Sequence, residues 1–254
     1  MDRQKLLYAL AGLALGALAS YYFANRANGG EIERLRSELA RTSRTQPEAG
    51  AGAAGGVRPQ DQSQAEAQVR ELIAGADANP SDSSLQRRAG EQVYRHALTT
   101  QQSALLAEAV RLLRRAHEGD PKNYDTLLLL GNSHLTLGLA GDPQSFTEAR
   151  GYYVNALAER PGDVNGHTLL GMTYYYGRPA DPQSAAREYR KALDADPRHE
   201  MALQNLASAL LATGALDEAT RRVGELEKVN PANGSLGELR AKLQQARGGV
   251  KGGE

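Results

Sequence analysis

Apolar residues recur along this chain at the spacing of paired amphipathic helices, and the pattern is clearest over residues 200–231. Leu203, Leu206 and Leu210 fall on one face of a first helix, and Gly214 then interrupts the pattern. A second apolar set with the same spacing follows the glycine and ends before a proline. This arrangement predicts a helix, a tight turn and a second helix.

Prolines separate successive copies of this pattern. Pro80, Pro121, Pro161, Pro197 and Pro231 follow one another at intervals of 41, 40, 36 and 34 residues. Residues 142–145 and 181–184 each insert Asp-Pro-Gln-Ser between the two helices of a copy, which accounts for part of the extra length. Asp followed by Pro begins a helix well, and Ser145 with Glu148 offers an alternative capping box. Periods of this length are typical of stacked helical repeats.

The pattern also predicts how the chain is divided. The predicted segments are a short head at 1–5, an apolar helix at 6–24, a juxtamembrane helix at 25–41, a disordered Gly/Ala/Pro linker at 42–60, degenerate repeat-like helices at 61–122, hairpins at 123–163, 164–199 and 200–233, a capping helix at 234–246 and a disordered tail at 247–254. Stacked hairpins bury their apolar faces against their neighbours, and a more polar end helix covers the last one.

Composition supports an all-α fold and narrows the classes of function. Isoleucine occurs only twice, whereas Ala, Leu, Arg, Glu and Gln are abundant, so we expect no sheet. Lys+Arg and Asp+Glu both total 30, so the chain has no net charge to attract nucleic acid. The absence of cysteine excludes disulfides, thiolate metal sites and a cysteine nucleophile.

Residues 6–24 form a run of 19 uncharged, mostly apolar residues. As a helix they would extend about 28 Å, close to the hydrocarbon thickness of a bilayer. Cleavage of a signal peptide after Ala19 is the alternative, because Ala17 and Ala19 satisfy the small-residue rule. Basic residues flank the run on both sides. We expect a retained single-pass anchor in a bacterial inner membrane, with the C-terminal repeats in the periplasm.

Three of the hairpins carry a shared set of small and large residues. The set is Leu127, Leu130, Gly131, His134, Ala149, Tyr153, Ala156 and Pro161 in one copy; His167, Leu170, Gly171, Tyr174, Ala185, Tyr189, Ala192 and Pro197 in the next; and Leu203, Leu206, Ala207, Leu210, Ala219, Val223, Leu226 and Pro231 in the last. The chain resembles the tetratricopeptide repeat family at these positions. The resemblance implies a right-handed α-solenoid of helical hairpins.

The resemblance also implies a concave groove lined by the first helix of each hairpin. The groove positions are Asp125, Leu128, Asn132, Leu135, Asn165, Thr168, Met172, Tyr175, Tyr176, Met201, Gln204, Asn205, Ser208 and Leu211. Tyr and Met beside amide groups suit a protein or peptide segment, extended or helical. The family's carboxylate clamp for chaperone tails needs basic residues, and Asn132 and Asn205 lack such partners here.

The residues that could carry chemistry do not form a recognisable site. The five histidines have no metal-ligand spacing, and His134 and His167 fall on packing positions. After His199-Glu200, Leu203 stands where a second zinc histidine would be needed. No phosphate-binding loop or serine-nucleophile motif is present. We therefore expect no enzyme, no cofactor and no metal.

The sequence supports two hypotheses of function. In the first, a membrane-anchored scaffold holds a polypeptide client in the groove; this architecture is similar to that of the repeat subunits of bacterial cytochrome c haem-lyase systems. In the second, the repeats are a structural or assembly subunit of a larger envelope machine, such as a translocon or secretion complex, without a client in the groove. The oligomeric state is open in both.

Overall fold

The computed structural model describes residues 59–100 and 102–251. The predicted head, anchor and juxtamembrane helix at 1–41 lie outside these residues, as does almost all of the predicted linker. Within the described ranges every regular element is a helix, which confirms the all-α prediction for this part of the chain. No helix among the described residues is both long enough and apolar enough to cross a bilayer.

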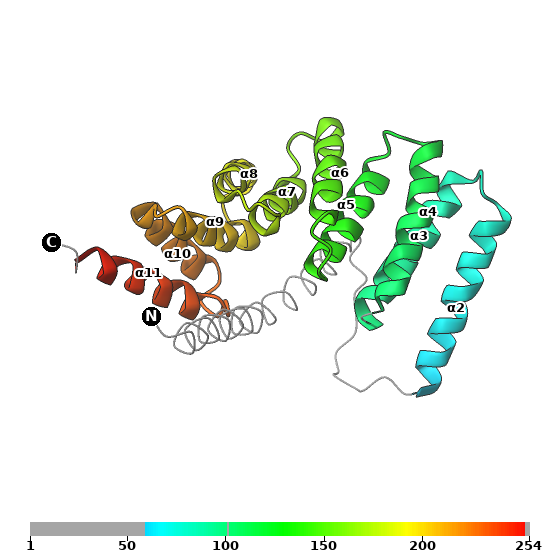
Figure 1. Ribbon diagram of the computed structural model, residues 1–254, viewed down its shortest axis with the longest axis horizontal. Coiled ribbons are helices and arrows are strands. Elements are labelled where there is room, and N and C mark those ends of the chain that lie inside the picture. The colour runs from blue at the N-terminus through cyan, green and yellow to red at the C-terminus, as the bar shows by residue number, and fades with distance from the viewer. Residues whose placement is uncertain (1–58, 101, 252–254) are drawn as a thin grey trace, which may run out of the picture. The chain divides into compact units, whose positions relative to one another are not determined.

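The helices follow one another with short connections, and Figure 1 shows them in chain order from cyan to red. They are α2 (Pro59–Ala78), α3 (Ser83–Thr100), α4 (Ser103–Gly119), α5 (Tyr124–Leu139), α6 (Ser145–Glu159), α7 (Val164–Tyr176), α8 (Pro182–Ala195), α9 (Glu200–Ala212), α10 (Leu216–Val229) and α11 (Leu236–Lys251). The predicted hairpins at 123–163, 164–199 and 200–233 correspond to α5–α6, α7–α8 and α9–α10.

Contacts between helices define the hairpins and the inner side of the stack. The most extensive contacts join α3 to α4, α5 to α6, α7 to α8 and α9 to α10. Contacts that skip one helix join α3 to α5, α5 to α7, α7 to α9 and α9 to α11. The first helices of the hairpins therefore approach one another, which places them on the inner, concave side of the described solenoid.

A glycine of the first helix accommodates a tyrosine of the second in two hairpins. A Cβ atom on Gly131 would lie 2.6 Å from the ring of Tyr153, and a Cβ on Gly171 would meet the ring of Tyr189 in the same way. Both tyrosines are completely buried. Because this distance is shorter than van der Waals contact, only glycine allows the two helices to pack this closely. The small and large positions predicted from the sequence thus meet at the helix interface.

Two tight turns depend on a glycine with positive φ. Gly214 has a φ of 75°, and the N–H of Ala215 donates to the carbonyl of Leu210 at 2.9 Å. Gly141 has a φ of 114°, and the N–H of Asp142 donates to the carbonyl of Leu137 at 3.1 Å. These bonds close the C-terminal ends of α9 and α5 in the manner of a Schellman motif. The break predicted at Gly214 is therefore a helix stop with a defined geometry.

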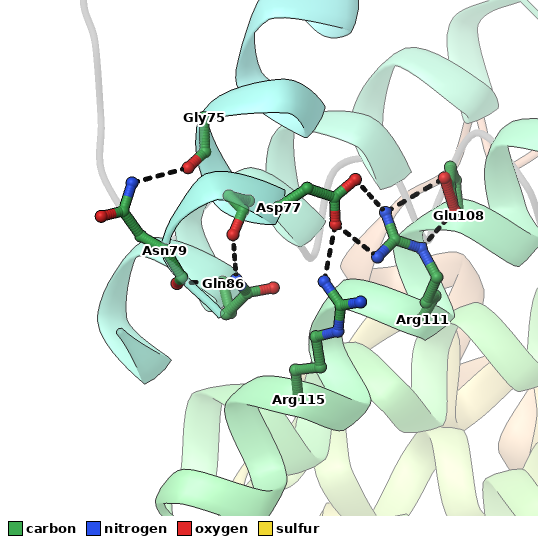
Figure 2. Close-up of polar contacts among 8 residues, drawn as sticks. Gly75, Asp77, Asn79, Gln86, Glu108, Arg111 and Arg115 are labelled. Carbon is green, nitrogen blue, oxygen red and sulfur yellow. Dashed lines mark hydrogen bonds and ion pairs between the residues drawn. The ribbon is translucent and has the colours of Figure 1, made fainter. Parts of the chain in front are cut away.

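Helix α2 is attached to the first described hairpin by polar contacts, which Figure 2 shows. The carboxylate of Asp77 accepts hydrogen bonds from Arg111 and Arg115 of α4, each at 2.6 Å. These two bonds lower the pKa of Asp77. The buried Gln86 donates from its amide to the carbonyls of Ala76 at 2.6 Å and Asn79 at 3.1 Å. The end of α2 is therefore held by both charged and neutral hydrogen bonds.

The last helix is longer than the sequence pattern indicates. The sequence predicts a capping helix over 234–246 and a tail from 247, but α11 continues to Lys251. Arg247 donates to Thr220 at 3.0 Å and lies 3.4 Å from the carboxylate of Asp217, so side-chain contacts with α10 extend beyond the predicted end. Gly248 has a low intrinsic helix propensity, which is why the periodicity alone placed the end earlier.

Candidate partner-binding groove

A hollow of about 450 Å³ lies among the inner helices at the C-terminal end of the stack. It is lined by Tyr175 from α7, by Ser208, Leu211 and Ala212 from α9, and by Lys242, Gln245 and Ala246 from α11. Three helices that are separate in sequence therefore contribute to one concavity. Concave sites with apolar walls and a few polar groups are the usual form of binding sites in proteins.

The walls of this hollow combine apolar, aromatic and amide surfaces. Leu211, Ala212 and Ala246 provide aliphatic surface, while Gln245 and Ser208 provide hydrogen-bonding groups. The rings of Tyr175 and Tyr176 make an edge-to-face contact with centroids 5.0 Å apart. Such a pair presents a rigid aromatic surface with phenolic groups that can form hydrogen bonds.

Charge is sparse on this face. Helix α7 contains no Asp, Glu, Lys or Arg. In α9 the sole residue of these four types is Glu200, at the start of the helix. Lys242 of α11 pairs with Glu238 at 2.6 Å, and both side chains are more than half exposed. An exposed pair of this kind contributes little to stability, so Lys242 can exchange its partner at low cost. The face therefore favours apolar and amide contacts over strong electrostatic attraction.

The structure separates the predicted groove residues by their exposure. Asp125 is exposed; Leu128, Asn165, Tyr175, Tyr176, Ser208 and Leu211 are half-buried; Asn132, Leu135, Thr168, Met172, Met201, Gln204 and Asn205 are buried. Tyr175, Ser208 and Leu211 meet in the hollow between α7, α9 and α11. Asp125 and Leu128 of α5 do not line that hollow. The role of all fourteen residues in partner binding stays a prediction.

Several of the buried groove residues have structural hydrogen bonds. The amide oxygen of Asn132 accepts a bond of 2.7 Å from the Tyr153 hydroxyl. Thr168 donates to the carbonyl of Val164 at 2.8 Å, and the amide oxygen of Gln204 accepts from Asn233 at 3.3 Å. These side chains therefore fix helices within or between hairpins. The family pattern indicates the helix face on which they lie, but it does not indicate how deeply they are buried.

The residues that α11 contributes to the hollow were missed in the sequence. Lys242, Gln245 and Ala246 lie three and four residues apart, so they share one helix face. Another face, with Leu236, Leu239 and Leu243, is buried. The amphipathic pattern predicted the buried face and left the other as solvated surface. The contact between α9 and α11, which no periodicity shows, turns it into a groove wall.

A second hollow, of about 400 Å³, lies between α8 and α10. Its polar lining includes Arg190 and Arg222, and the carboxylate of Glu218 lies between them. Arg190 donates to both oxygens of Glu218, at 3.1 and 2.7 Å, and this bond lowers the pKa of the carboxyl. The two arginines already have carboxylate partners, so this hollow has no uncompensated positive charge for an anionic ligand.

Two buried histidines have pKa values that are shifted in opposite directions. Burial lowers the pKa of His134, and the nearby Arg114 lowers it further; neither ring nitrogen has a hydrogen-bond partner among the described residues. His167 instead contacts the carboxylate of Glu188 at 2.8 Å, and this hydrogen bond raises its pKa. No group of three or more His, Asp or Glu residues in the described ranges is arranged to hold a metal ion.

The comparisons with known proteins agree with the arrangement of helices. The family model described as "Tetratricopeptide repeat" matches residues 180–243, from the end of the α7–α8 connection into α11. Over these residues the chain is similar to tetratricopeptide repeats. The preceding hairpins α3–α4 and α5–α6 also pack a glycine of the first helix against a large side chain of the second, Leu113 or Tyr153, and they continue the all-helical stack.

A curated relative is the mitochondrial import receptor subunit TOM20-4 of Arabidopsis thaliana. It is 33% identical over 89 residues, which make up 33% of this chain and 48% of the relative. The chain thus spans about half of the length of this relative.

Several solved structures share the fold. A crystal structure of MamA protein covers 80% of this chain and 93% of its own, with a TM-score of 0.56 and 15% identity. MamA from Desulfovibrio magneticus RS-1 gives the same TM-score, with 14% identity over 80% of this chain and 98% of its own. TTC0263 of Thermus thermophilus, a thermophilic tetratricopeptide protein, has a TM-score of 0.50 and 17% identity over 83% of this chain and 98% of its own.

Proposed function

We propose that this protein is a scaffold for protein–protein interactions that holds a polypeptide segment against the inner helices α7, α9 and α11. The observation that carries the proposal is the hollow lined by Tyr175, Ser208, Leu211 and Lys242 on the concave side of a tetratricopeptide solenoid. Stacked repeats commonly use such a concave surface for binding. The dimensions of the hollow suit one or two side chains of a longer bound segment.

The lining indicates the chemistry of that segment. Aliphatic surface from Leu211 and Ala246 favours an apolar side chain of the partner. Gln245 and Ser208 can form hydrogen bonds with its backbone, because each provides both donor and acceptor capacity. The segment would lie along several helices and occupy the hollow with one anchor residue.

The test uses the full-length chain as bait, with variants on the two sides of the solenoid. Tyr175→Ala and Ser208→Arg change the inner surface at half-buried positions, and Val154→Arg changes a side chain that is 48% exposed on α6. The proposal predicts that the first two variants lose the same co-purified polypeptide by at least about tenfold, equivalent to about 1.4 kcal/mol. Val154→Arg should retain it. Equal recovery by all three variants contradicts the proposal.

We further propose that the scaffold is membrane-anchored through residues 6–24 and acts on the periplasmic side, with cytochrome c maturation as one setting. The support is the length and hydropathy of that run in the sequence. Fusion of alkaline phosphatase to the C-terminus is the test, because this reporter is active only after export. Activity of the fusion supports the orientation, and an inactive fusion together with an active cytoplasmic reporter overturns it.

A second candidate is a subunit of an envelope assembly that uses other faces of the solenoid. The name of the curated relative, a subunit of a mitochondrial import receptor, favours this candidate. It predicts broad tolerance of substitutions at Tyr175 and Ser208. Substitutions on the outer helices α6, α8 and α10 would then release the chain from a complex of larger mass, which size-exclusion chromatography of membrane extracts would detect.

A further inference from the structure

The imidazole of His167 connects the two helices of the hairpin α7–α8. Its Nδ1 atom lies 2.8 Å from a carboxylate oxygen of Glu188 on α8, and its Nε2 atom lies 2.9 Å from the carbonyl oxygen of Pro161. The histidine and glutamate side chains are only 11% and 12% exposed. Both ring nitrogens therefore face oxygen atoms in a largely buried site.

This geometry determines the protonation state that fits best. A carbonyl oxygen accepts hydrogen bonds and cannot donate them, so Nε2 must carry a proton to bond with Pro161. An ionised carboxylate is also an acceptor, so Nδ1 must carry a proton to bond with Glu188. Only the doubly protonated, cationic ring satisfies both contacts. In either neutral tautomer, one nitrogen lone pair would face an oxygen lone pair at less than 3 Å.

The charged groups around the site come mainly from α8. The hydrogen bond with Glu188 raises the pKa of His167 most, burial opposes the rise, and the positive charge of Lys191 also opposes it. Lys191 donates to the other oxygen of Glu188 at 2.9 Å. From the α6–α7 connection, the facing group is the uncharged carbonyl of Pro161. From α9, the neighbouring titratable group is His199, which lies 3.4 Å from Thr168.

His199 has the opposite requirement. It caps the N-terminus of α9, and its Nδ1 accepts a hydrogen bond of 3.3 Å from the N–H of Ala202. An accepting nitrogen carries no proton, so the cap requires the neutral ring. Burial lowers the pKa of His199. Consecutive hairpins thus contain one histidine that bonds best when charged and one that bonds best when neutral.

We propose that His167 is a proton-controlled brace between α7 and α8 that regulates the groove surface carried by the C-terminal end of α7. The protonated ring holds the start of α7 to Glu188. Loss of the proton removes one of its two hydrogen bonds and weakens the attachment of α7, which also carries Tyr175 and Tyr176. The effect on a bound partner rests on the proposed function, whereas the proton-controlled brace does not.

The sign of the pH dependence follows from linkage. The raised pKa of His167 in the folded protein means that its contribution is complete below the unfolded value of about 6.5. That contribution is lost as the pH rises through the folded pKa. His199 acts in the other direction, because its lowered pKa makes its contribution complete above about pH 6.5 and lost as the pH falls. Together they define a pH window in which the α7–α9 region is most stable.

The direct experiment is a titration of the histidine ring signals by NMR in the full-length chain, with His167→Gln used to assign the signal. We expect His167 to titrate above about 6.5, and His134 and His199 to titrate below that value. Nitrogen-15 shifts should show both ring nitrogens of His167 protonated at pH 6. A His167 signal that titrates at or below the ordinary histidine value overturns the proposal.

Two substitutions near the ring should shift its midpoint in opposite directions. Glu188→Gln keeps an acceptor but removes the negative charge, so the midpoint of His167 should fall. Lys191→Met removes a positive charge from a side chain that is 55% exposed, so the midpoint should rise. A histidine that is not bonded to Glu188 would show almost the same midpoint in both variants. An unchanged midpoint in both variants would contradict the brace.

Thermal unfolding and partner capture complete the test. The melting temperature of the native chain at pH 6 should exceed that of His167→Gln by about 2–4 °C, and the difference should shrink at pH 8.5. A difference that is the same at both pH values contradicts the proposal. If His167 titrates as expected but Tyr175→Ala retains every polypeptide recovered by the native chain, the result contradicts the proposed function. It would still support the proton-controlled contact between His167 and Glu188.

Discussion

The hairpins α5–α6 and α7–α8 share one packing scheme but use the same tetrapeptide differently. In α7–α8, Asp181 caps the helix that begins at the next residue and accepts from the N–H of Ser184 at 2.9 Å. In α5–α6, the helix begins only at Ser145, and Asp142 accepts from the Ser145 hydroxyl at 2.6 Å within a turn. Identical Asp-Pro-Gln-Ser sequences thus form a helix cap in one hairpin and a turn in the other.

Packing further along each second helix explains the difference. Ala149 follows Asp142 by seven residues, whereas Ala185 follows Asp181 by four. In the longer copy, Phe146 packs against Gly138, where an added Cβ atom would lie 2.9 Å from the ring. This contact fixes the first turn of α6, so that Asp142, Pro143 and Gln144 remain in the connection between α5 and α6. Local propensity favours a helix start after Asp142 as well as after Asp181. Tertiary packing overrides this propensity at Asp142, where the helix begins later.

The two hairpins also differ in the groups that surround their buried histidines. His134 is buried, and its ring stacks on Tyr152 with a centroid distance of 5.5 Å. His167 lies between a carboxylate and a carbonyl oxygen. The Gly–Tyr packing is therefore the same in both hairpins, whereas the surroundings of His134 and His167 differ. As a result, the pKa of His134 is lowered and that of His167 is raised.

The largest expected effect tests the shared framework. Tyr153→Ala and Tyr189→Ala should each lower the free energy of unfolding by about 3–5 kcal/mol, because each leaves a cavity beside a glycine. Val154→Ala, at an exposed neighbouring position, should change it by less than about 0.5 kcal/mol. Urea unfolding followed by circular dichroism measures all three. A loss for one tyrosine that does not exceed the loss for Val154→Ala would show that the hairpins are packed differently.

The next effect concerns the glycine side of the same contact. Gly131→Ala should destabilise the protein by about 1–3 kcal/mol, because the new methyl group overlaps the Tyr153 ring. Gly151→Ala on α6 is the matched control, since no atom lies within 4 Å of the added Cβ. It should stabilise by up to about 1 kcal/mol through helix propensity. The same chemical change should therefore have opposite signs at the two sites, and equal signs contradict the close packing.

A smaller effect should distinguish the two aspartates. Asp181→Ala removes a helix cap and should cost about 1 kcal/mol. Asp142→Ala removes hydrogen bonds within an exposed turn and should cost less, about 0.5 kcal/mol. Thermal unfolding of the two variants in the same buffer provides the comparison. A greater loss for Asp142→Ala would indicate that the turn, and not the cap, fixes the start of the second helix.

The smallest effect is the pH dependence due to His134. Because burial lowers its pKa in the folded protein, its contribution to stability is present above the unfolded value of about 6.5 and is lost as the pH falls. His134→Phe keeps the stacking on Tyr152 and removes the titrating group. The acid side of the stability profile should become flatter, while the alkaline side is unchanged. If the alkaline side of the stability profile became flatter instead, the pKa of His134 would not be lowered, and this prediction would be contradicted.

The repeat architecture could be predicted from sequence because its signals are local. Helical spacing, Gly214 and the prolines indicate the hairpins, and the offsets of Gly131, Tyr153, Gly171 and Tyr189 indicate which residues pack together. These features depend on neighbours within one hairpin. The sequence pattern is accordingly most informative where contacts are close along the chain.

The groove could be predicted only in part because it depends on neighbouring hairpins. The family pattern places Asn132 and Met172 on the inner helices, but both are buried. It does not indicate that α11 lies beside α9 and contributes Lys242 and Gln245. The partner of His167, which is 21 residues away on another helix, also follows from tertiary packing and not from periodicity.

The proposed function is tested most directly by placing a photo-crosslinking amino acid at Ser208, or at Val154 as the control, in the full-length chain in cells. Ser208 lines the inner hollow, and Val154 is exposed on α6. We expect crosslinking at Ser208 to produce a heavier band that contains a second polypeptide, and crosslinking at Val154 to produce none. A heavier band from Val154 alone, or no intermolecular product from Ser208, would contradict it.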